Sequence, residues 1–156
     1  MYKRQAISNA ASMLKTFPGA EKHRNLKVYV DGAAVPNPGP SGIGVVIYDE
    51  RKKKIKEVKK SIGLASNNVA EYKALIQGLK ESERLLAQSV NIFSDSELLV
   101  NQMSGRFRIN DEDLRRLFQQ AKTLENKFEG VAYHLIGRNE NRLADQLANN
   151  AIKKFT

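Results

Sequence analysis

The order of strand-like and helix-like segments is the feature that most limits how this chain can fold. Three strand patterns come first, and a turn at DERKK predicts that the second and third form a hairpin. Helical and strand patterns then alternate to the end of the sequence. This order predicts an α/β domain, a mixed sheet with helices on its faces. The expected strands cover residues 27–31, 42–48, 54–62, 90–93 and 131–136, and the expected helices cover 68–87, 96–102, a segment capped by Asn110, and 141–155.

Length and composition exclude several classes of protein. A chain of 156 residues fits one domain with a real core. The absence of cysteine excludes disulfide scaffolds, thiol catalysis and cysteine zinc sites. No apolar run approaches the roughly 18 residues that span a bilayer, and the first residues lack the apolar segment of a secretory signal. We therefore expect a cytoplasmic protein with no membrane partner.

Positive charge is concentrated in two segments of a chain with net charge +9. Residues 1–25 hold five Lys or Arg and one Glu, a net charge of +4, in the pattern of a short amphipathic helix. We expect this segment to be a basic extension of a domain over residues 26–156. Residues 51–60 hold seven Lys or Arg and one Glu, a net charge of +6. These lysines suit either contact with a nucleic acid or protection of an exposed sheet edge, and both interpretations stay open.

Four carboxylates stand where strands end or helices begin. Asp31 ends the first strand, in VYVDGAAVPNPGPSGIG, where an isolated carboxylate costs several kcal/mol unless a partner compensates it. Glu71 lies on the apolar face of its helix, Asp95 follows the strand VNIF, and Asp145 lies in NRLADQLANNA. Each alone has an ordinary explanation. Glu71 suits the helix dipole, Asp95 suits an N-terminal cap, and Asp145 suits a helix surface.

Together, the four carboxylates suggest a metal site. Converging carboxylates raise one another's pKa unless a cation lies among them. Oxygen ligands without sulfur suit Mg²⁺ or Mn²⁺. Two such ions, about 3.5–4 Å apart, are the arrangement that drives in-line phosphodiester displacement. A metal ion would then compensate the charge of Asp31.

Four stretches of the sequence resemble type 1 ribonuclease H in order and spacing: YVDGAAVPNPGPSGIG, SNNVAEYKALIQGL, IFSDSELLV and NRLADQLANNA. The resemblance covers about residues 26–153. It implies the ribonuclease H-like fold, a five-stranded mixed sheet flanked by helices. It also implies endonucleolytic hydrolysis of the RNA strand of RNA–DNA hybrids with two Mg²⁺ or Mn²⁺ ions. The catalytic and metal-binding residues would be Asp31, Glu71, Asp95 and Asp145.

The same resemblance implies a set of substrate contacts. Asn67 and Asn68 would read the RNA strand across the minor groove, and Asn37 would be a weaker contact. A hybrid is recognised through its shape and its 2′-hydroxyls, and amide side chains can both donate to and accept from a hydroxyl. Without the resemblance, the pair Asn67–Asn68 would equally suit a helix cap.

The sequence departs from the family pattern in three places. Arg138 occupies the position of a loop histidine, where it cannot serve as a base but can hold a phosphate. His134 falls within a strand pattern and is interpreted as structural. Glu97 stands where a neutral amide often contacts the substrate. The basic handle of some members is missing, and Arg106 and Arg108 are interpreted as its remnant.

The sequence therefore predicts a monomeric, metal-dependent endoribonuclease that acts on RNA–DNA hybrids. The alternatives are a non-catalytic hybrid-binding module of the same fold and a nuclease of this fold that acts on DNA. The presence of all four acids argues against the first alternative. The pair Asn67–Asn68 argues against the second, because these side chains suit an RNA strand.

Overall fold

The structure, a computed structural model, describes residues 25–152 and has a five-stranded sheet with the strand order β3-β2-β1-β4-β5. The first three strands are antiparallel neighbours, whereas β1, β4 and β5 run parallel. The predicted mixed sheet is therefore confirmed. The strands are β1 (Asn25–Ala34), β2 (Gly39–Tyr48), β3 (Lys54–Ala65), β4 (Ser89–Ser94) and β5 (Gly130–Leu135), and the helices are α2 (Asn67–Arg84), α3 (Glu97–Met103), α4 (Glu112–Glu125), the 3₁₀ turn η1 (Arg138–Glu140) and α5 (Arg142–Ala151).

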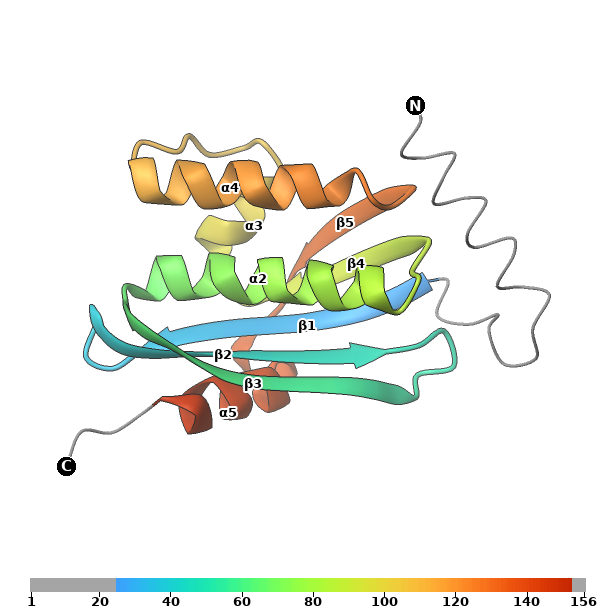
Figure 1. The fold of residues 1–156 in the computed structure, drawn as a ribbon, viewed down its shortest axis with the longest axis horizontal. Coiled ribbons are helices and arrows are strands. Elements are labelled where there is room, and N and C mark those ends of the chain that lie inside the picture. The colour runs from blue at the N-terminus through green and yellow to red at the C-terminus, as the bar shows by residue number, and fades with distance from the viewer. Residues whose placement is uncertain (1–24, 153–156) are drawn as a thin grey trace.

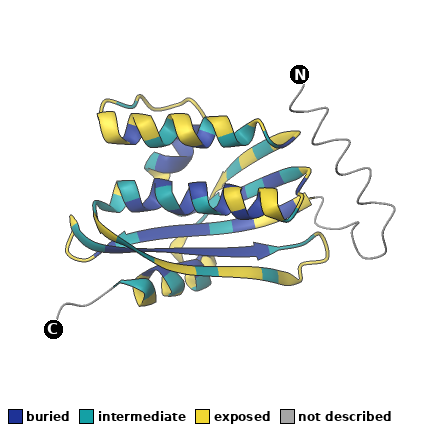
Figure 2. Cartoon of the chain, in the orientation of Figure 1, coloured by how far each residue is buried: buried dark blue, intermediate teal, exposed yellow. Residues whose placement is uncertain are grey.

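The sheet separates two layers of helices. In Figure 1, α2, α3 and α4 lie on one side of the sheet and α5 lies on the other. The main core fills the space between the sheet and α2, where Figure 2 shows buried residues on both elements. Its largest members alternate along the strands with residues of the opposite face, as expected for strands buried on both sides. The strands contribute Val28, Val30, Ile43, Val45 and Ile47, and α2 contributes Tyr72, Leu75 and Leu79.

The opposite face of the sheet packs closely against α5 through two glycines of β2. A Cβ atom at Gly44 would lie 2.2 Å from the carbonyl oxygen of Ala144, and one at Gly42 would lie 2.3 Å from that of Ala148. Side chains at these positions would therefore push α5 away from the sheet. Gly44 pairs with Asp31 in the ladder between β1 and β2, so this contact also sets the position of α5 relative to Asp31.

The predicted helix ends need two corrections. Asp111, not Asn110, caps α4, since its side chain accepts a hydrogen bond of 3.0 Å from the amide of Leu114. The last helix ends at Ala151 and not at residue 155, because Ile152 has an extended backbone. The predicted extension over residues 1–25 lies, except for Asn25, outside the described residues and stays a prediction. Among the described residues, no helix has the length and apolarity needed to cross a bilayer.

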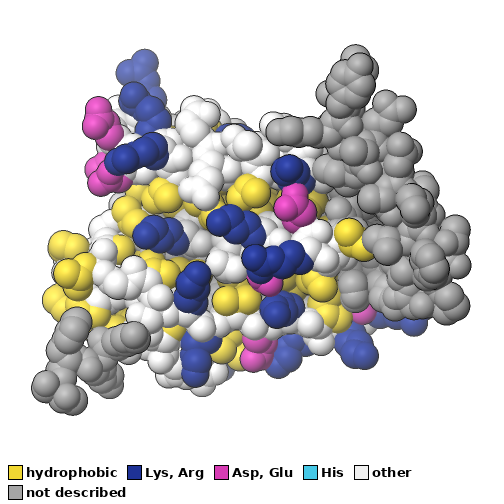
Figure 3. All heavy atoms as spheres, viewed as in Figure 1, with side chains coloured by type: hydrophobic (Ala, Val, Ile, Leu, Met, Phe, Trp, Pro, Cys, Tyr) yellow, Lys and Arg dark blue, Asp and Glu magenta, His cyan; other side chains and the backbone are white. Residues whose placement is uncertain are grey.

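The lysine-rich segment lies on β3, the strand at one edge of the sheet. Ile55 and Val58 pack against the core, while the lysines between and beyond them are exposed. Figure 3 shows Lys and Arg side chains spread over the face that α2 and β3 form. This placement agrees with the expected protection of an exposed edge. Contact between these lysines and a nucleic acid stays a prediction.

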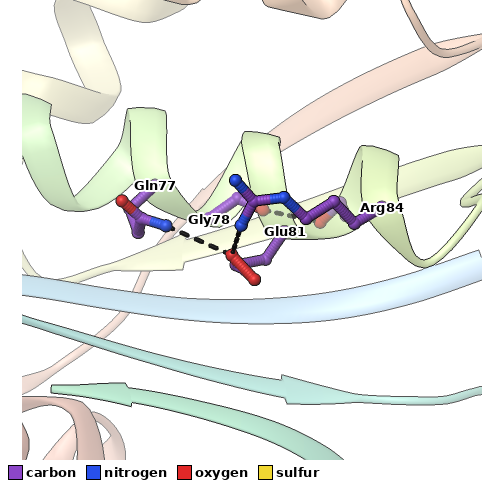
Figure 4. A network of polar contacts seen from close by, with 5 residues as sticks. Gln77, Gly78, Glu81 and Arg84 are labelled. Atoms are coloured by element: carbon purple, nitrogen blue, oxygen red, sulfur yellow. Dashed lines mark hydrogen bonds and ion pairs between the residues drawn. The ribbon is translucent and has the colours of Figure 1, made fainter.

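A buried carboxylate on α2 has its own cation. Glu81 is almost fully buried, and its Oε2 atom accepts hydrogen bonds from Arg84 Nη1 at 2.5 Å and from Gln77 Nε2 at 3.2 Å (Figure 4). The guanidinium offsets the cost of burying this charge. Glu81 thus serves as an internal reference for the carboxylates described below.

We predict that Gly44→Ala lowers the free energy of unfolding by about 1–3 kcal/mol, because the added methyl group overpacks the contact with α5. Gly130→Ala is the matched control, since a Cβ atom there would meet nothing within 4 Å. Urea denaturation of both variants measures the difference. An equal effect of the two substitutions would show that close packing of α5 is not what Gly44 provides.

Candidate active site

The site lies where two parallel strands separate. β1 and β4 pair only as far as Tyr29 and Phe93, and Asp31 and Asp95 lie two residues further along each chain. Asp31 and Asp95 each lie two residues after an aromatic residue, Tyr29 and Phe93 respectively. Because side chains two apart in a strand point to the same side, these residues face the α5 side of the sheet. A gap beyond the carboxyl ends of parallel strands is where α/β proteins commonly bind ligands. The sheet topology therefore brings Asp31 and Asp95 together.

Glu71 reaches this gap from α2 because a glycine lets the helix touch β1. A Cβ atom at Gly32 would lie 2.2 Å from the carbonyl carbon of Ala70, closer than any side chain allows. The amide of Gly32 donates a hydrogen bond of 2.5 Å to Glu71 Oε1. This contact fixes the carboxylate of Glu71 beside Asp31, the residue that precedes Gly32 in β1. The first turn of α2 contains no acidic residue, so the alternative that Glu71 complements the dipole from the first turn of this helix is wrong.

Asp95 contacts an asparagine side chain and does not cap a helix. The side chain of Ser96 accepts from the amide of Leu99 and caps α3, so the interpretation of Asp95 as a cap is wrong. The Nδ2 atom of Asn141 lies 3.5 Å from Asp95 Oδ2 and donates to the carbonyl of Val30 at 2.9 Å. Asn141 thus links the end of β1 to Asp95.

Asn141 has a second notable feature, its side-chain oxygen. This Oδ1 atom is buried and has no hydrogen-bond partner among the described residues. The backbone carbonyl of the same residue accepts from the amide of Asp145 at 3.0 Å, within the first turn of α5. The sequence reasoning did not identify Asn141, although its position one helical turn before Asp145 is a usable signal.

Three of the four predicted acids form a tight cluster. Asp31, Glu71 and Asp95 each offer a carboxylate oxygen, and these three atoms lie within 4.8 Å of one another. Asp145 lies outside that group and is exposed on α5, yet it is near enough to raise the pKa of Asp31 by a hydrogen bond and that of Asp95 by its charge. The structure therefore brings the four predicted carboxylates to one place, with Asp145 at the margin.

Burial and mutual repulsion raise the pKa values of the cluster. For Asp31 the largest cause is burial, followed by the charges of Glu71 and Asp95. Burial also raises the pKa of Glu71, against the hydrogen bond from Gly32. Burial raises the pKa of Asp95 too, whereas the amide of Asn141 and the charge of Arg138 lower it. Without a cation, the cluster favours bound protons over negative charge.

The donor set fits a hard divalent cation. No ion pair joins Asp31, Glu71 or Asp95 to a Lys or Arg within residues 25–152, in contrast to Glu81 and its partner Arg84. The three acids supply carboxylate oxygens only, which are the ligands that Mg²⁺ and Mn²⁺ prefer. The cluster could therefore hold a metal ion.

The predicted substrate contacts lie around the start of α2. Asn37 Oδ1 accepts from the backbone amide of Asn67 at 2.9 Å, and Asn67 Oδ1 accepts from the amide of Ala34 at 2.7 Å. Asn68 is exposed on the first turn of α2. Because Ser66 is the cap of this helix, the alternative of an Asn67–Asn68 capping pair is wrong. The amide nitrogens of Asn37 and Asn67 make no hydrogen bond within the described part of the chain, so both can donate outward.

The structure also shows where the residues that depart from the family pattern lie. Arg138 lies in the turn η1, exposed but near enough for its charge to act on Asp95. His134 lies in β5 as predicted, but it is exposed and not buried. Glu97 is the first residue of α3, where its charge suits the helix dipole. Residues 104–111, which include the exposed Arg106 and Arg108, join α3 directly to α4.

Comparison with known proteins gives relatives along most of the chain. A family model described as "Reverse transcriptase-like" matches residues 29–151. The bifunctional protein Rv2228c of Mycobacterium tuberculosis is 40% identical over 126 residues, which cover 80% of this chain and 35% of that protein. The chain thus spans about a third of that relative's length. A ribonuclease H of Trichodesmium erythraeum is 31% identical over 151 residues, covering 86% of this chain and 93% of the relative.

The fold is similar to that of solved ribonuclease H structures. LC11-RNase H1, solved in complex with an RNA/DNA hybrid, superposes with a TM-score of 0.77 at 37% identity, covering 81% of this chain and 96% of that chain. The sequence, the sheet topology and the clustered acids all agree with membership of one family. The chain belongs to the type 1 ribonuclease H family, within the group of reverse transcriptase-like domains.

Proposed function

We propose that this protein is an endoribonuclease that hydrolyses the RNA strand of RNA–DNA hybrids. The observation that carries the proposal is the cluster of Asp31, Glu71 and Asp95, three buried or half-buried carboxylates without a cationic side chain to compensate them. A stable fold tolerates such a cluster most readily where a cation completes it. The solved hybrid complex of LC11-RNase H1 supports the choice of substrate.

The acids would hold two divalent ions, Mg²⁺ or Mn²⁺, with Asp31, Glu71 and Asp95 as the central ligands and Asp145 beside them. Such ions, when bound, supply an activated water and offset the charge that develops on the leaving oxygen. The protein's own part is to keep the ligands in place. Gly32 fixes Glu71 through its backbone amide, and Asn141 fixes Asp95 through its side chain.

The substrate would lie across the start of α2. The backbone amide of Asn67 orients the side chain of Asn37, and the backbone amide of Ala34 orients that of Asn67. The two side-chain amide nitrogens would therefore form a fixed pair of donors for hydroxyl groups of the RNA strand. Asn68 would add a third contact on the same turn. Arg138 would contact a phosphate, since it is exposed close to the acids and carries five donors in a planar fork.

The alternatives account for less of the site. A module that only binds hybrids has no need for an uncompensated carboxylate cluster, which repels phosphates. A nuclease for DNA has no use for donors directed at 2′-hydroxyls. The monomeric state and the cytoplasmic location stay predictions.

The first test is the reaction itself. With Mg²⁺ or Mn²⁺ present, we expect the full chain to cut the RNA strand of a labelled hybrid and to leave matched double-stranded DNA and double-stranded RNA intact. Excess EDTA should abolish cleavage, because the acids then lack their ions. Gel analysis of end-labelled strands measures both results. Cleavage that persists in EDTA, or that is confined to DNA, would refute the proposal.

A second test separates catalysis from binding. Asp95→Asn keeps the size of the side chain and removes a charge, so we expect the cleavage rate to fall by orders of magnitude while hybrid affinity holds or rises. Asp113→Asn is the control, because Asp113 is an exposed acid on α4 with a surface partner, Arg116. Single-turnover cleavage and a binding titration give the two quantities. Normal cleavage by Asp95→Asn would remove Asp95 from the catalytic set.

A third test uses the pH dependence of stability in EDTA. Burial and the neighbouring acids raise the pKa of Asp31 to about 10, so the folded protein retains a proton that the unfolded chain loses near pH 4. The free energy of unfolding should therefore fall as the pH rises from about 4 toward 10. Asp31→Asn should flatten this slope and be more stable than wild type at about pH 8. Parallel curves for the two proteins in urea titrations would contradict the assignment.

A further inference from the structure

A column of aromatic rings crosses the sheet beside the acids. The rings of Tyr29 on β1 and Phe93 on β4 are stacked with centroids 4.7 Å apart and planes 13° apart. The ring of His134 on β5 continues the stack at 4.8 Å and 21°. Tyr48 closes the other end with an edge-to-face contact to Tyr29 at 5.6 Å. The spacing of the stack equals the distance between neighbouring strands, so the sheet itself sets it.

This column lies on the same face of the sheet as the proposed catalytic acids. Tyr29 and Phe93 are ladder partners two residues before Asp31 and Asp95, so the row of rings and the row of acids are parallel and about 7 Å apart. The rings are not part of the main core, which lies on the opposite face. They are half-buried or exposed, unlike most aromatic residues of a sheet packed between helices.

The column ends on an exposed ring. β5 is the outermost strand of the sheet on this side, and His134 is exposed. Its Nε2 atom lies 2.8 Å from Asn91 Oδ1, a contact that holds the imidazole in line with the stack. The outer face of His134 is therefore a fixed aromatic surface at the position where the next ring of the column would lie.

We propose that His134 and the column behind it form a stacking site for an unpaired nucleobase of a single-stranded segment that adjoins the hybrid. Proteins that bind single strands stack bases on aromatic side chains, and a histidine ring can serve in this way. Every base offers a flat face, so no sequence preference is expected. Arg138 follows His134 by four residues and is near enough for its charge to act on Asp95, so a cationic group that could bind a phosphate lies in the segment that follows the strand of His134.

The inference rests on the proposed function for its substrate, but its test does not require cleavage. We would measure the affinity of the full chain in EDTA for a short blunt hybrid and for the same hybrid carrying a single-stranded extension at each strand end in turn. A fluorescent adenine analogue in the extension reports stacking directly. One stacked base is worth about fivefold to a hundredfold in affinity, so at least one extension should bind more tightly by that factor.

Three variants identify the ring responsible. His134→Ala should lose the gain from the extension and keep the affinity for the blunt hybrid, whereas His134→Phe should keep both, because it retains an aromatic face. Leu135→Ala is the control, an exposed neighbour that points to the other side of the strand. Wild type with no gain from any extension, or His134→Ala with equal losses on both ligands, would overturn the inference. A protein that shows the gain but cuts no hybrid would refute the proposed function alone.

Discussion

The contact between α2 and β1 at Gly32 is the constraint on which the site depends. Only a residue without a side chain lets the backbone of Ala70 approach this closely, and the approach brings Glu71 within hydrogen-bond reach of the Gly32 amide. The same contact holds the carboxylate of Glu71 close to Asp31, at a place where both residues are buried. Two like charges there raise the energy of the folded protein unless protons or a cation neutralise them. The position of a glycine thus determines the electrostatics of the site.

Glu81 shows what the fold does with a buried carboxylate that has only a structural role. It lies on the same helix as Glu71, ten residues later, and Arg84 compensates it from the next turn. Arg138, the basic residue that acts on Asp95, is exposed and forms no ion pair with the cluster within residues 25–152. The uncompensated charge is therefore specific to the site and not a general feature of the core. The uncompensated charge destabilises the folded state. A cation that binds to the folded state alone offsets this effect, because such binding stabilises that state.

The fold and the carboxylates could be predicted from sequence because their signals are local. Asp31 and Asp95 follow apolar strand patterns, Glu71 and Asp145 lie within amphipathic helices, and the family motifs fix the order. The predicted end of the first strand at Asp31 was wrong, since β1 continues to Ala34 through its pairing with β2. The helix caps were less predictable, since Asn110 stands beside Asp111 and Asp95 beside Ser96, and backbone geometry decides which side chain reaches the amides. The position of Asn141 before Asp145 is a local signal, but its contact could not be predicted locally, because the carbonyl of Val30 is 111 residues away in the chain.

The aromatic column depends on the same register of β1 and β4 as the acids. In the sequence, Tyr29 and Phe93 are ordinary strand residues. Their two rings stack only because β1 and β4 pair in parallel at these positions. That pairing ends at these residues, so the strands begin to separate directly beyond the stack, where Asp31 and Asp95 follow. A stiff stack of rings at this point limits how far the strand ends can move, because sliding either strand would break the ring contacts. The register that creates the column therefore also limits the distance between the two aspartates, although the ladder between β1 and β4 ends two residues before them.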